Sequence, residues 1–152
     1  MGQRSAVSLK SERDGMAFTI RRVEYYYANV RDELGAAYRV LARLAELGVN
    51  LLAFTAMPSG PSLAQFALFP DDPSKLIAQA RAAGLPLDGP YHALLVQGDD
   101  ELGALANVHE QLVEAGVDIF ASSGVTDSRG AFGYLIYVRE DQFEKAAIAL
   151  AL

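Results

Sequence analysis

The sequence contains no cysteine and no tryptophan, and it has only two histidines, His92 and His109. Without cysteine the chain cannot form disulfides, thiolate nucleophiles or cysteine metal sites, and two histidines leave a zinc site short of ligands. Basic charge is also scarce, since 13 Lys and Arg stand against 19 Asp and Glu, for a formal net charge of −6. Lys and Arg supply most of the affinity for a phosphate backbone. We therefore expect no metal, no other cofactor and no nucleic acid partner.

Long apolar runs are missing as well. Hydrophobic residues make up 51% of the chain, but no stretch approaches the roughly 20 apolar residues of a membrane-spanning helix. The opening residues, MGQRSAVSLK, lack the apolar core of a signal peptide. These absences predict a cytoplasmic protein with no membrane partner. Residues 1–16 are polar and aperiodic, and we interpret them as a flexible N-terminal lead.

The sequence does contain an internal repeat. Residues 32–51, DELGAAYRVLARLAELGVNL, match residues 100–119, DELGALANVHEQLVEAGVDI, without a gap and with 10 of 20 positions identical. Such a self-match indicates a duplicated module. Two copies are too few for a solenoid, which needs three or more repeats to bury a continuous core. The pattern predicts two tandem domains, 17–88 and 89–152.

Both copies show the same order of expected elements, read from alternating patterns for strands and 3.6-residue patterns for helices. The first copy predicts strands at 17–28, 49–57 and 62–69, a helix from Asp32 to Gly48, and a helix at 74–83. The second copy predicts strands at 91–97, 117–123 and 131–138, and helices at 101–115 and from 141 onward. Each unit is thus β-α-β-β-α with a fourth strand that is weak or absent. This order is typical of an α+β, ferredoxin-like unit with an antiparallel sheet and helices on one face.

The first helix of copy one has candidate signals at both ends. Asp32 is a candidate N-cap, and Gly48 is a candidate stop. Gly35 falls inside the expected first turn, where glycine costs about 1 kcal/mol relative to alanine. A close approach by a ligand or by a packed strand would explain that glycine. The apolar positions that share one expected helical face are Leu34, Ala37, Leu41, Leu44 and Gly48.

Two short motifs recur at matched places in the two copies. The pattern D-x-x-G, at Asp32/Gly35 and Asp100/Gly103, opens each first helix, and G-V-[N/D]-[L/I], at 48–51 and 116–119, follows it. In this order of elements the motifs resemble those of the ACT-domain family of small-molecule-sensing modules, over residues 17–152. Family members usually have D-R-P-G, whereas Leu34 and Leu102 replace the proline here.

The resemblance implies a non-catalytic regulatory protein that binds an amino acid or similar effector where two such units meet, and that acts on a protein partner. The ligand-binding residues implied by position are Asp32, Gly35, Asn50, Asp100, Gly103 and Asp118. Physical chemistry agrees, because helix N-terminal N–H groups suit a carboxylate and Asp or Asn oxygens accept from an ammonium group. Asp118 replaces Asn50, so we expect unequal sites. Exposed sheet edges predict a homodimer.

Simpler interpretations stay open. Asp32 and Asp100 as helix caps alone, and Asn50 and Asp118 as helix-exit residues, are adequate alternatives. The three tyrosines at 25–27 and His109 are interpreted as packed residues. No nucleophile and base pair, G-x-S-x-G motif or P-loop is present, so we predict no catalytic residues and no enzyme activity. The rival functions are a structural or protein-interaction module without a metabolite, and a small ferredoxin-like hydrolase for which Arg31 is the only hint.

Overall fold

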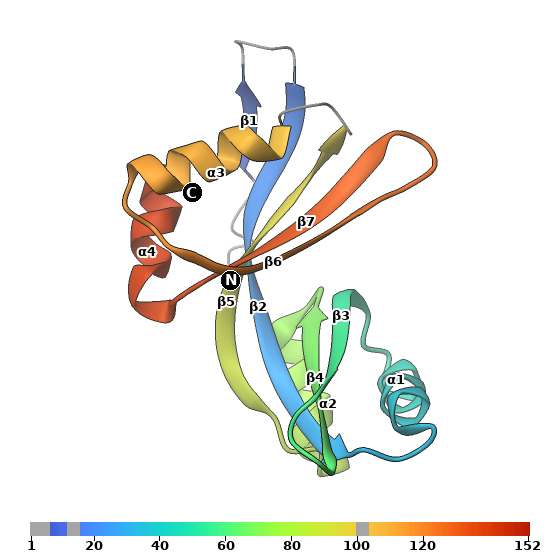
Figure 1. The fold of residues 1–152 in the computed structure, drawn as a ribbon. Helices are drawn as coiled ribbons and strands as arrows, with labels where there is room; N and C mark the ends of the chain where they lie inside the picture. Colours follow the sequence, from blue (N-terminus) through green and yellow to red (C-terminus); the bar gives the residue numbers. More distant parts are fainter. Residues whose placement is uncertain (1–6, 12–15, 100–103) are drawn as a thin grey trace. The chain divides into compact units, whose positions relative to one another are not determined.

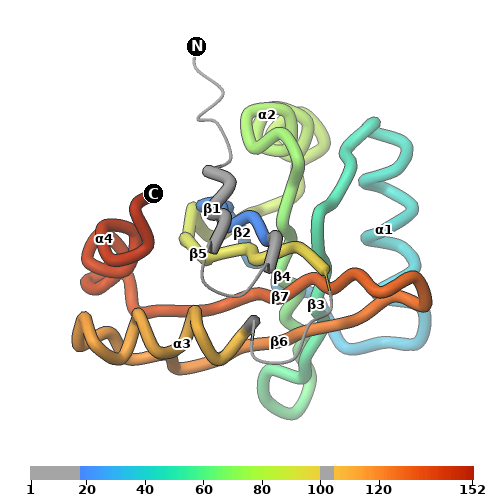
Figure 2. Tube along the Cα trace, turned by 90° about the horizontal axis from the view of Figure 1, so that it is seen from above, coloured from blue at the N-terminus to red at the C-terminus, as the bar shows by residue number. Residues whose placement is uncertain are grey.

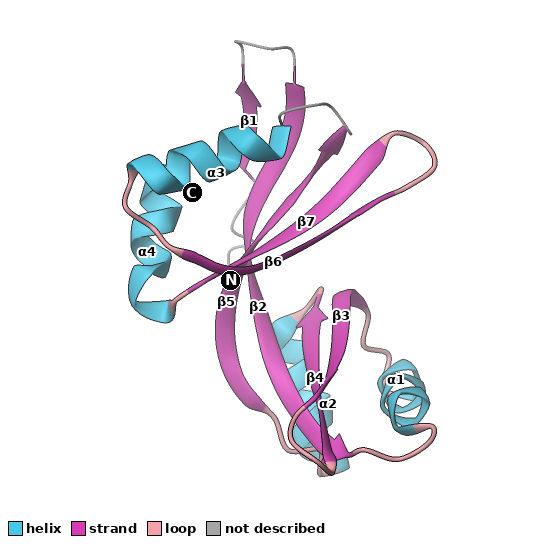
Figure 3. Ribbon diagram, in the orientation of Figure 1, coloured by secondary structure: helices cyan, strands magenta, loops and turns pink. Residues whose placement is uncertain are grey.

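The computed structural model describes residues 7–11, 16–99 and 104–152. Within them the chain is a mixed α+β protein with antiparallel strand pairing (Figure 3). The order predicted for the two copies is confirmed, with boundaries shifted by up to about four residues, and an extra strand, β1, falls within the expected lead. The elements are β1 (Val7–Ser11), β2 (Met16–Arg31), α1 (Ala36–Glu46), β3 (Leu51–Pro58), β4 (Leu63–Pro70), α2 (Pro73–Ala83), β5 (Asp88–Asp99), α3 (Ala104–Glu114), β6 (Ile119–Thr126), β7 (Ala131–Val138) and α4 (Glu140–Ala149). Among the described residues, no helix combines the length and the apolarity needed to cross a membrane.

The packing divides the chain into two compact units. The first-repeat unit is continuous and spans Glu24–Tyr91, whereas the second-repeat unit joins the segment that ends at Val23 to His92–Leu152. The boundary falls inside β2 and inside β5, so each of these strands contributes residues to both units (Figure 1). The sequence repeat divides the chain at residue 88 instead, and the repeat and the packing therefore follow different boundaries.

In the first-repeat unit the strand order is β3-β4-β2-β5. Its buried core contains Val40 and Leu44 of α1, Leu76 of α2, and Phe66 and Leu68 of β4. Phe66 and Leu68 are two residues apart, so their side chains point to the same face of the strand. Both helices of this unit therefore cover one face of its strands.

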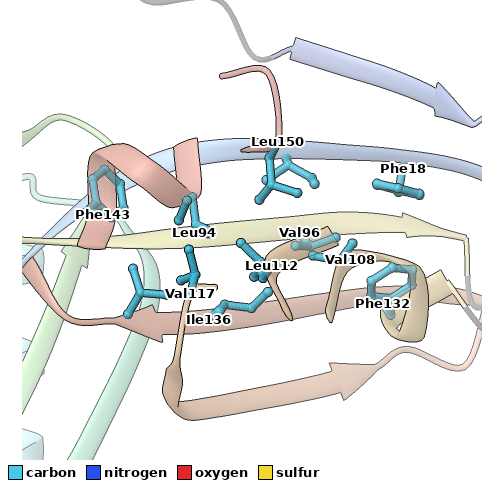
Figure 4. Close-up of a cluster of buried hydrophobic side chains, with 13 residues drawn as sticks. Phe18, Leu94, Val96, Val108, Leu112, Val117, Phe132, Ile136, Phe143 and Leu150 are labelled. Carbon is cyan, nitrogen blue, oxygen red and sulfur yellow. The ribbon is translucent and has the colours of Figure 1, made fainter. Parts of the chain in front are cut away.

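In the second-repeat unit the order is β6-β7-β5-β2, with β1 paired to β2 on the outside. The core is drawn in Figure 4, where side chains from α3 and α4 meet those of the strands. Val108 and Leu112 come from α3, Phe143 and Leu150 from α4, and Ile136 from β7. Seen from above in Figure 2, α3 runs along the β6–β7 hairpin. This unit thus has the same helix-on-sheet arrangement as the other.

The fourth strand of the second-repeat unit comes from the start of the chain. Thr19 of β2 donates a hydrogen bond from Oγ1 to the carbonyl oxygen of Gln97 in β5, at 3.4 Å. Ile20 is fully buried in the core of this unit. Arg22 forms an ion pair with Glu144 of α4, at 3.0 Å between Nη1 and Oε1. The segment before Val23 therefore completes the second repeat.

The fourth strand of the first-repeat unit is the beginning of β5. The ring of Tyr91 lies 5.6 Å from that of Tyr25 and 5.2 Å from that of Tyr27, both in β2. Gly89 packs so closely that a Cβ there would lie 2.9 Å from Cδ1 of Tyr26. The fourth strand expected to be weak or absent is therefore present in both units.

Helix α1 begins later than the sequence predicts. Its N-cap is Gly35, with a φ of 82°, and no side chain of the described residues caps it. The prediction of Asp32 as the N-cap is therefore wrong. The positive φ explains the glycine, because a side chain is disfavoured in that conformation. A Cβ at Gly35 would meet Nη1 of Arg39 at 3.5 Å, which is an ordinary contact and gives no sign of a packed strand.

The apolar face predicted for α1 also differs from the one observed. The buried residues are Ala36, Val40 and Leu44, whereas Leu34 is 100% exposed and Leu41 is 40% exposed. Both sets are apolar at helical spacing, because α1 is rich in alanine and leucine on most sides. Periodicity alone could not choose between them. The consequence is a set of large apolar side chains in contact with solvent.

The helix ends follow the sequence more closely. Gly48 ends α1 as predicted, and the N–H of Val49 donates to the carbonyl oxygen of Leu44 at 2.9 Å, a common closing bond. The equivalent bond, also 2.9 Å, closes α3 in the second repeat. Asp72 caps α2, because its Oδ1 accepts from the N–H of Lys75 at 3.2 Å.

The outer strands β3 and β6 carry the same irregularity. The register of β3 on β4 shifts at Leu52, between Leu51 and Ala53, and the register of β6 on β7 shifts at the equivalent residue Phe120. A β-bulge leaves one residue unpaired and redirects its side chain. Leu52 and Phe120 are 36% and 55% exposed. The matched bulges support the duplication.

The β6–β7 turn provides a prediction that depends on pH. Oδ1 of Asp127 accepts from the N–H of Arg129 at 2.7 Å and from that of Ala131 at 3.0 Å. These bonds lower the pKa of Asp127 from its ordinary value of 3.8, with the Ala131 bond the larger cause. Because the pKa of Asp127 is lower in the folded state than in the unfolded state, its ionised carboxylate stabilises the folded turn at any pH above the unfolded-state pKa. This stabilisation is lost as the pH falls through the folded-state pKa.

We expect the NMR titration of Asp127 to have its midpoint below 3.8, and the amide signals of Arg129 and Ala131 to move in the same transition. In Asp127→Ala these amide signals should not show that transition. A midpoint at or above 3.8 would contradict the hydrogen-bonded turn.

Candidate ligand-binding site

The segment between β2 and α1 is held by hydrogen bonds on both sides. The N–H of Asp32 donates to the carbonyl oxygen of Ser62 at 2.9 Å. Arg39 donates from Nη1 to the carbonyl oxygen of Leu34 at 3.2 Å, and its Nη2 lies 3.3 Å from Oε2 of Glu33. The side chain of Asp32 is exposed. The segment therefore presents one carboxylate to solvent from a fixed backbone.

The start of α1 is suited to an anion. The first N–H groups of any helix have no acceptor within the helix, and they carry the positive end of its dipole. No described side chain caps α1, and the N–H of Ala36 already donates to the carbonyl oxygen of Glu33 at 3.0 Å. A ligand carboxylate would therefore bind the N–H groups that follow Ala36 in the first turn. The exposed carboxylate of Asp32 lies just before them and can accept hydrogen bonds from an ammonium group. Together they provide complementary groups for an α-amino acid.

Asn50 lies at the other end of the same helix. Its side chain is exposed, and its carbonyl oxygen accepts from the N–H of Asp71 at 3.0 Å. Helix α1 has 11 residues, which corresponds to about 16 Å at 1.5 Å per residue. An amino acid is much shorter than that. The structure therefore does not bring Asn50 to Asp32 and Gly35 within one unit, and a site that uses all three needs a second unit.

The second repeat differs in detail. Asp118 is exposed, and its N–H donates to Oε1 of Gln142 in α4 at 3.0 Å. It occupies the same place after α3 as Asn50 does after α1. Asp100 and Gly103, the other two residues implied for this repeat, lie outside the described residues. The structure thus describes one member of the second set.

Sequence reasoning missed a lysine beside each helix exit. A Cβ at Gly48 would lie 3.2 Å from Nζ of Lys75, and a Cβ at Gly116 would lie 3.2 Å from Nζ of Lys145. An ammonium group at a helix C-terminus is favourable, because the helix dipole is negative there. The two lysines come from the second helix of each repeat but are offset by 70 residues, so the alignment did not pair them.

The residues interpreted as packed are confirmed in that role. Nε2 of His109 lies 2.7 Å from the hydroxyl of Tyr134, and both side chains are partly buried. The hydroxyl of Tyr26 donates to Oε2 of Glu24 at 2.9 Å. Burial raises the pKa of Tyr26, and the hydrogen bond to Glu24 and its charge raise it further. These groups stabilise the two cores and leave the candidate site to the ends of the first helices.

Arg31, the only hint of a hydrolase, is not part of a phosphate-binding loop. Its side chain is 80% exposed, and its Nη1 lies 3.7 Å from Oε1 of Glu33. A neighbouring carboxylate would repel a phosphate. The geometry around Arg31 therefore gives the hydrolase no support.

The fold can be compared with those of known proteins. No family model matches the sequence, and no curated protein matches it. Protein BT0572 from Bacteroides thetaiotaomicron has a similar structure, with a TM-score of 0.72, 17% identity, and coverage of 87% of this chain and 88% of that chain. The regulatory subunit of aspartate kinase from Thermus thermophilus has a TM-score of 0.55 and 17% identity, over 88% and 94%. That from Thermus flavus has a TM-score of 0.51 and 16% identity, over 97% and 97%.

The chain has an ACT-like fold. The resemblance indicated by the two short motifs is thereby confirmed for the fold. Identities of 16–17% establish the fold alone, because one fold serves many functions. In this ACT-like chain the described candidate residues lie at the two ends of α1 and, in the second repeat, directly after α3.

Proposed function

We propose that the protein is a non-catalytic regulatory module that binds an amino acid between ACT-like units, acts as a homodimer, and transmits binding to a protein partner. Each unit is taken as ferredoxin-like, because its first strand lies between its third strand and the added fourth strand. The predicted domains, 17–88 and 89–152, follow the boundaries of the sequence repeat. A cytoplasmic location remains a prediction. The ligand-binding residues proposed are Asp32, Gly35, Asn50, Asp100, Gly103 and Asp118.

One observation carries this proposal. Helix α1 begins without a side-chain cap among the described residues, and the exposed carboxylate of Asp32 stands beside that end. A helix whose first N–H groups are bound only by water is about 1 kcal/mol less stable than one with a side-chain N-cap. A ligand carboxylate would satisfy the same N–H groups. The likeness of the fold to regulatory subunits of aspartate kinase supports a regulatory role for such binding.

The test is a panel of the twenty amino acids in a thermal unfolding assay. A ligand that binds only the folded state adds about 2.7 kcal/mol at 100 times its dissociation constant. Asp32→Ala is expected to abolish the shift given by the active amino acid. It should change the stability of the free protein by less than about 0.5 kcal/mol, because Asp32 is exposed and caps no helix.

Asp72→Ala is the matched control. Asp72 is a true cap of α2, so its loss should cost about 0.5–2 kcal/mol of stability and leave the ligand-induced shift in place. The reverse pattern, with Asp72→Ala removing the shift and Asp32→Ala retaining it, would contradict the site. If no amino acid shifts the melting of the natural sequence, the interaction-module alternative becomes the better interpretation.

A further inference from the structure

Helix α3 lacks the balanced charges of α1, its counterpart in the first repeat. In α1 both arginines form ion pairs. Nη2 of Arg39 lies 3.3 Å from Oε2 of Glu33, and Nη1 of Arg43 lies 3.1 Å from Oε2 of Glu46. At the equivalent positions α3 has an asparagine and a glutamine, and it contains no lysine or arginine. The acidic side chains of α3 therefore have no basic neighbour on their own helix.

Two carboxylates on α3 are in positions that folding does not favour. Glu110 and Glu114 are exposed, and none of the ion pairs between described residues includes either of them. They are four residues apart, and like charges at this spacing on a helix repel each other. Glu114 also lies in the last turn of α3, where the helix dipole is already negative. Residues that conflict with local stability in this way are expected at functional surfaces.

The same side of α3 presents a large apolar side chain to solvent. Val113 is 70% exposed, and it lies three residues after Glu110 and directly before Glu114. The opposite side of the helix carries Val108 and Leu112, which are fully buried. Apolar side chains with a polar rim are the usual composition of a protein–protein interface. The solvent side of α3 therefore has the composition of an interface.

Helix α4 extends this surface. It packs against α3, and both views show the two helices next to each other (Figures 1 and 2). Nζ of Lys145 in α4 would lie 3.2 Å from a Cβ at Gly116, directly after α3. Ile148 is 75% exposed, and its spacing of three residues places it on the same side of α4 as Lys145. We call this surface the acidic face; it consists of Glu110, Val113, Glu114 and Ile148.

Charge selects the kind of partner that the acidic face can bind. Residues 92–152 contain 3 Lys and Arg against 10 Asp and Glu, for a net charge of −7 (3 − 10). This charge repels nucleic acids and anionic lipid surfaces and attracts cationic groups. We propose that the acidic face binds a basic amphipathic segment of a partner protein. Lysine or arginine of that segment lies opposite Glu110 and Glu114, and an apolar side chain packs against Val113.

The geometry of the face suits a helical segment. Helix α3 is 11 residues long, which corresponds to about 16 Å, and laying an amphipathic helix along an apolar surface is a common mode of recognition. The charges of α1 are paired, so docking is confined to the second repeat. That this segment belongs to the regulated protein rests on the proposed function, whereas the docking itself needs no amino acid.

Fluorescence anisotropy with two labelled peptides tests the docking. An amphipathic helical peptide of leucine and lysine should bind the full chain, with an affinity that falls as salt is added. The same peptide with glutamate in place of every lysine should not bind. Amide NMR signals that move on binding should lie in α3 and at the end of α4. Absence of binding, equal binding of both peptides, or shifts confined to α1 and α2 would overturn the inference.

Charge reversal separates the acidic face from the net charge of the chain. Glu110→Lys combined with Glu114→Lys should weaken binding of the leucine–lysine peptide about tenfold, because two attractive pairs become repulsive. Glu46→Lys combined with Asp71→Lys is the matched control, since both residues are exposed in the first-repeat unit. It changes the net charge equally and should alter the affinity by less than about twofold. Val113→Ser should weaken binding about fivefold through lost apolar burial.

Equal weakening by the two double variants would mean attraction by net charge alone and would overturn the inference. Circular dichroism checks that each variant is folded. Sedimentation of the chain with phosphatidylserine vesicles would assign the face to a membrane instead. A chain that shows a melting shift with an amino acid but does not bind the leucine–lysine peptide would contradict the acidic face and leave the proposed ligand binding standing. Peptide binding without any melting shift would do the reverse.

Discussion

Replacing Ile20 by alanine is expected to destabilise the second-repeat unit by about 2–5 kcal/mol. Ile20 lies 74 residues before Leu94 in the sequence (94 − 20), yet both are fully buried in the same cluster, which also contains Val96. Truncation would remove apolar contacts and leave a cavity, and close-packed cores relax only partly around cavities. The expected loss is a large share of the stability of a small domain.

Leu76→Ala is the matched variant for the first-repeat unit, because Leu76 is also fully buried, in the other core. Hydrogen exchange measured by mass spectrometry separates the two effects. Ile20→Ala should speed exchange most in α3 and α4, and Leu76→Ala should speed it most in α1 and α2. Faster exchange confined to α1 and α2 in Ile20→Ala would show that the first part of β2 does not belong to the second repeat.

The duplication and the order of elements could be predicted because their signals are local. Some of the identical residues at matched positions of the two repeats are buried in both. Val40 and Leu44 lie in one core, and the equivalent Val108 and Leu112 lie in the other. The helical spacing of apolar residues and the glycine that ends each first helix can likewise be read within a segment of about a dozen residues. Such patterns need no knowledge of which segments meet in space.

The sharing of β2 between two units could not be predicted in the same way. An apolar, β-branched run indicates a strand, but it does not say which strands lie beside it. Strand pairing between distant segments is decided by packing. One signal was available, since β2 has 16 residues, against a typical length of about five or six. A strand that long has enough residues to pair within both units.

The sequence predicted which residues belong to the candidate site, but not where they lie relative to one another. The motifs identified Asp32 and Asn50, but their separation by the whole of α1 follows only from the helix between them. The error over the N-cap had a specific cause, because the positive φ of Gly35 delays the helix start to Ala36. The same delay leaves Leu34 in solvent.

Gly89→Ala is expected to destabilise the first-repeat unit by about 2–6 kcal/mol, through two costs that add. Gly89 has a φ of +147°, and a side chain in that region costs about 1–3 kcal/mol. A Cβ would also lie 2.9 Å from Cδ1 of Tyr26 and 3.0 Å from the backbone oxygen of Tyr25. The backbone oxygen is held within β2, so the clash forces β5 away and overpacks the strand pair, at about 1–3 kcal/mol.

Gly60→Ala isolates the first cost. Gly60 has a φ of +81°, and a Cβ there would have no heavy atom within 4 Å, so only backbone strain of about 1–2 kcal/mol applies. In a chain of this size each kcal/mol lowers the melting temperature by about 2–4 °C, so the two variants should be separable in one thermal experiment. Equal losses would mean that β5 does not press against Tyr25 and Tyr26. A larger loss in Gly89→Ala means that the start of β5 is held tightly against β2, as a fourth strand must be if the first-repeat unit is to keep its sheet.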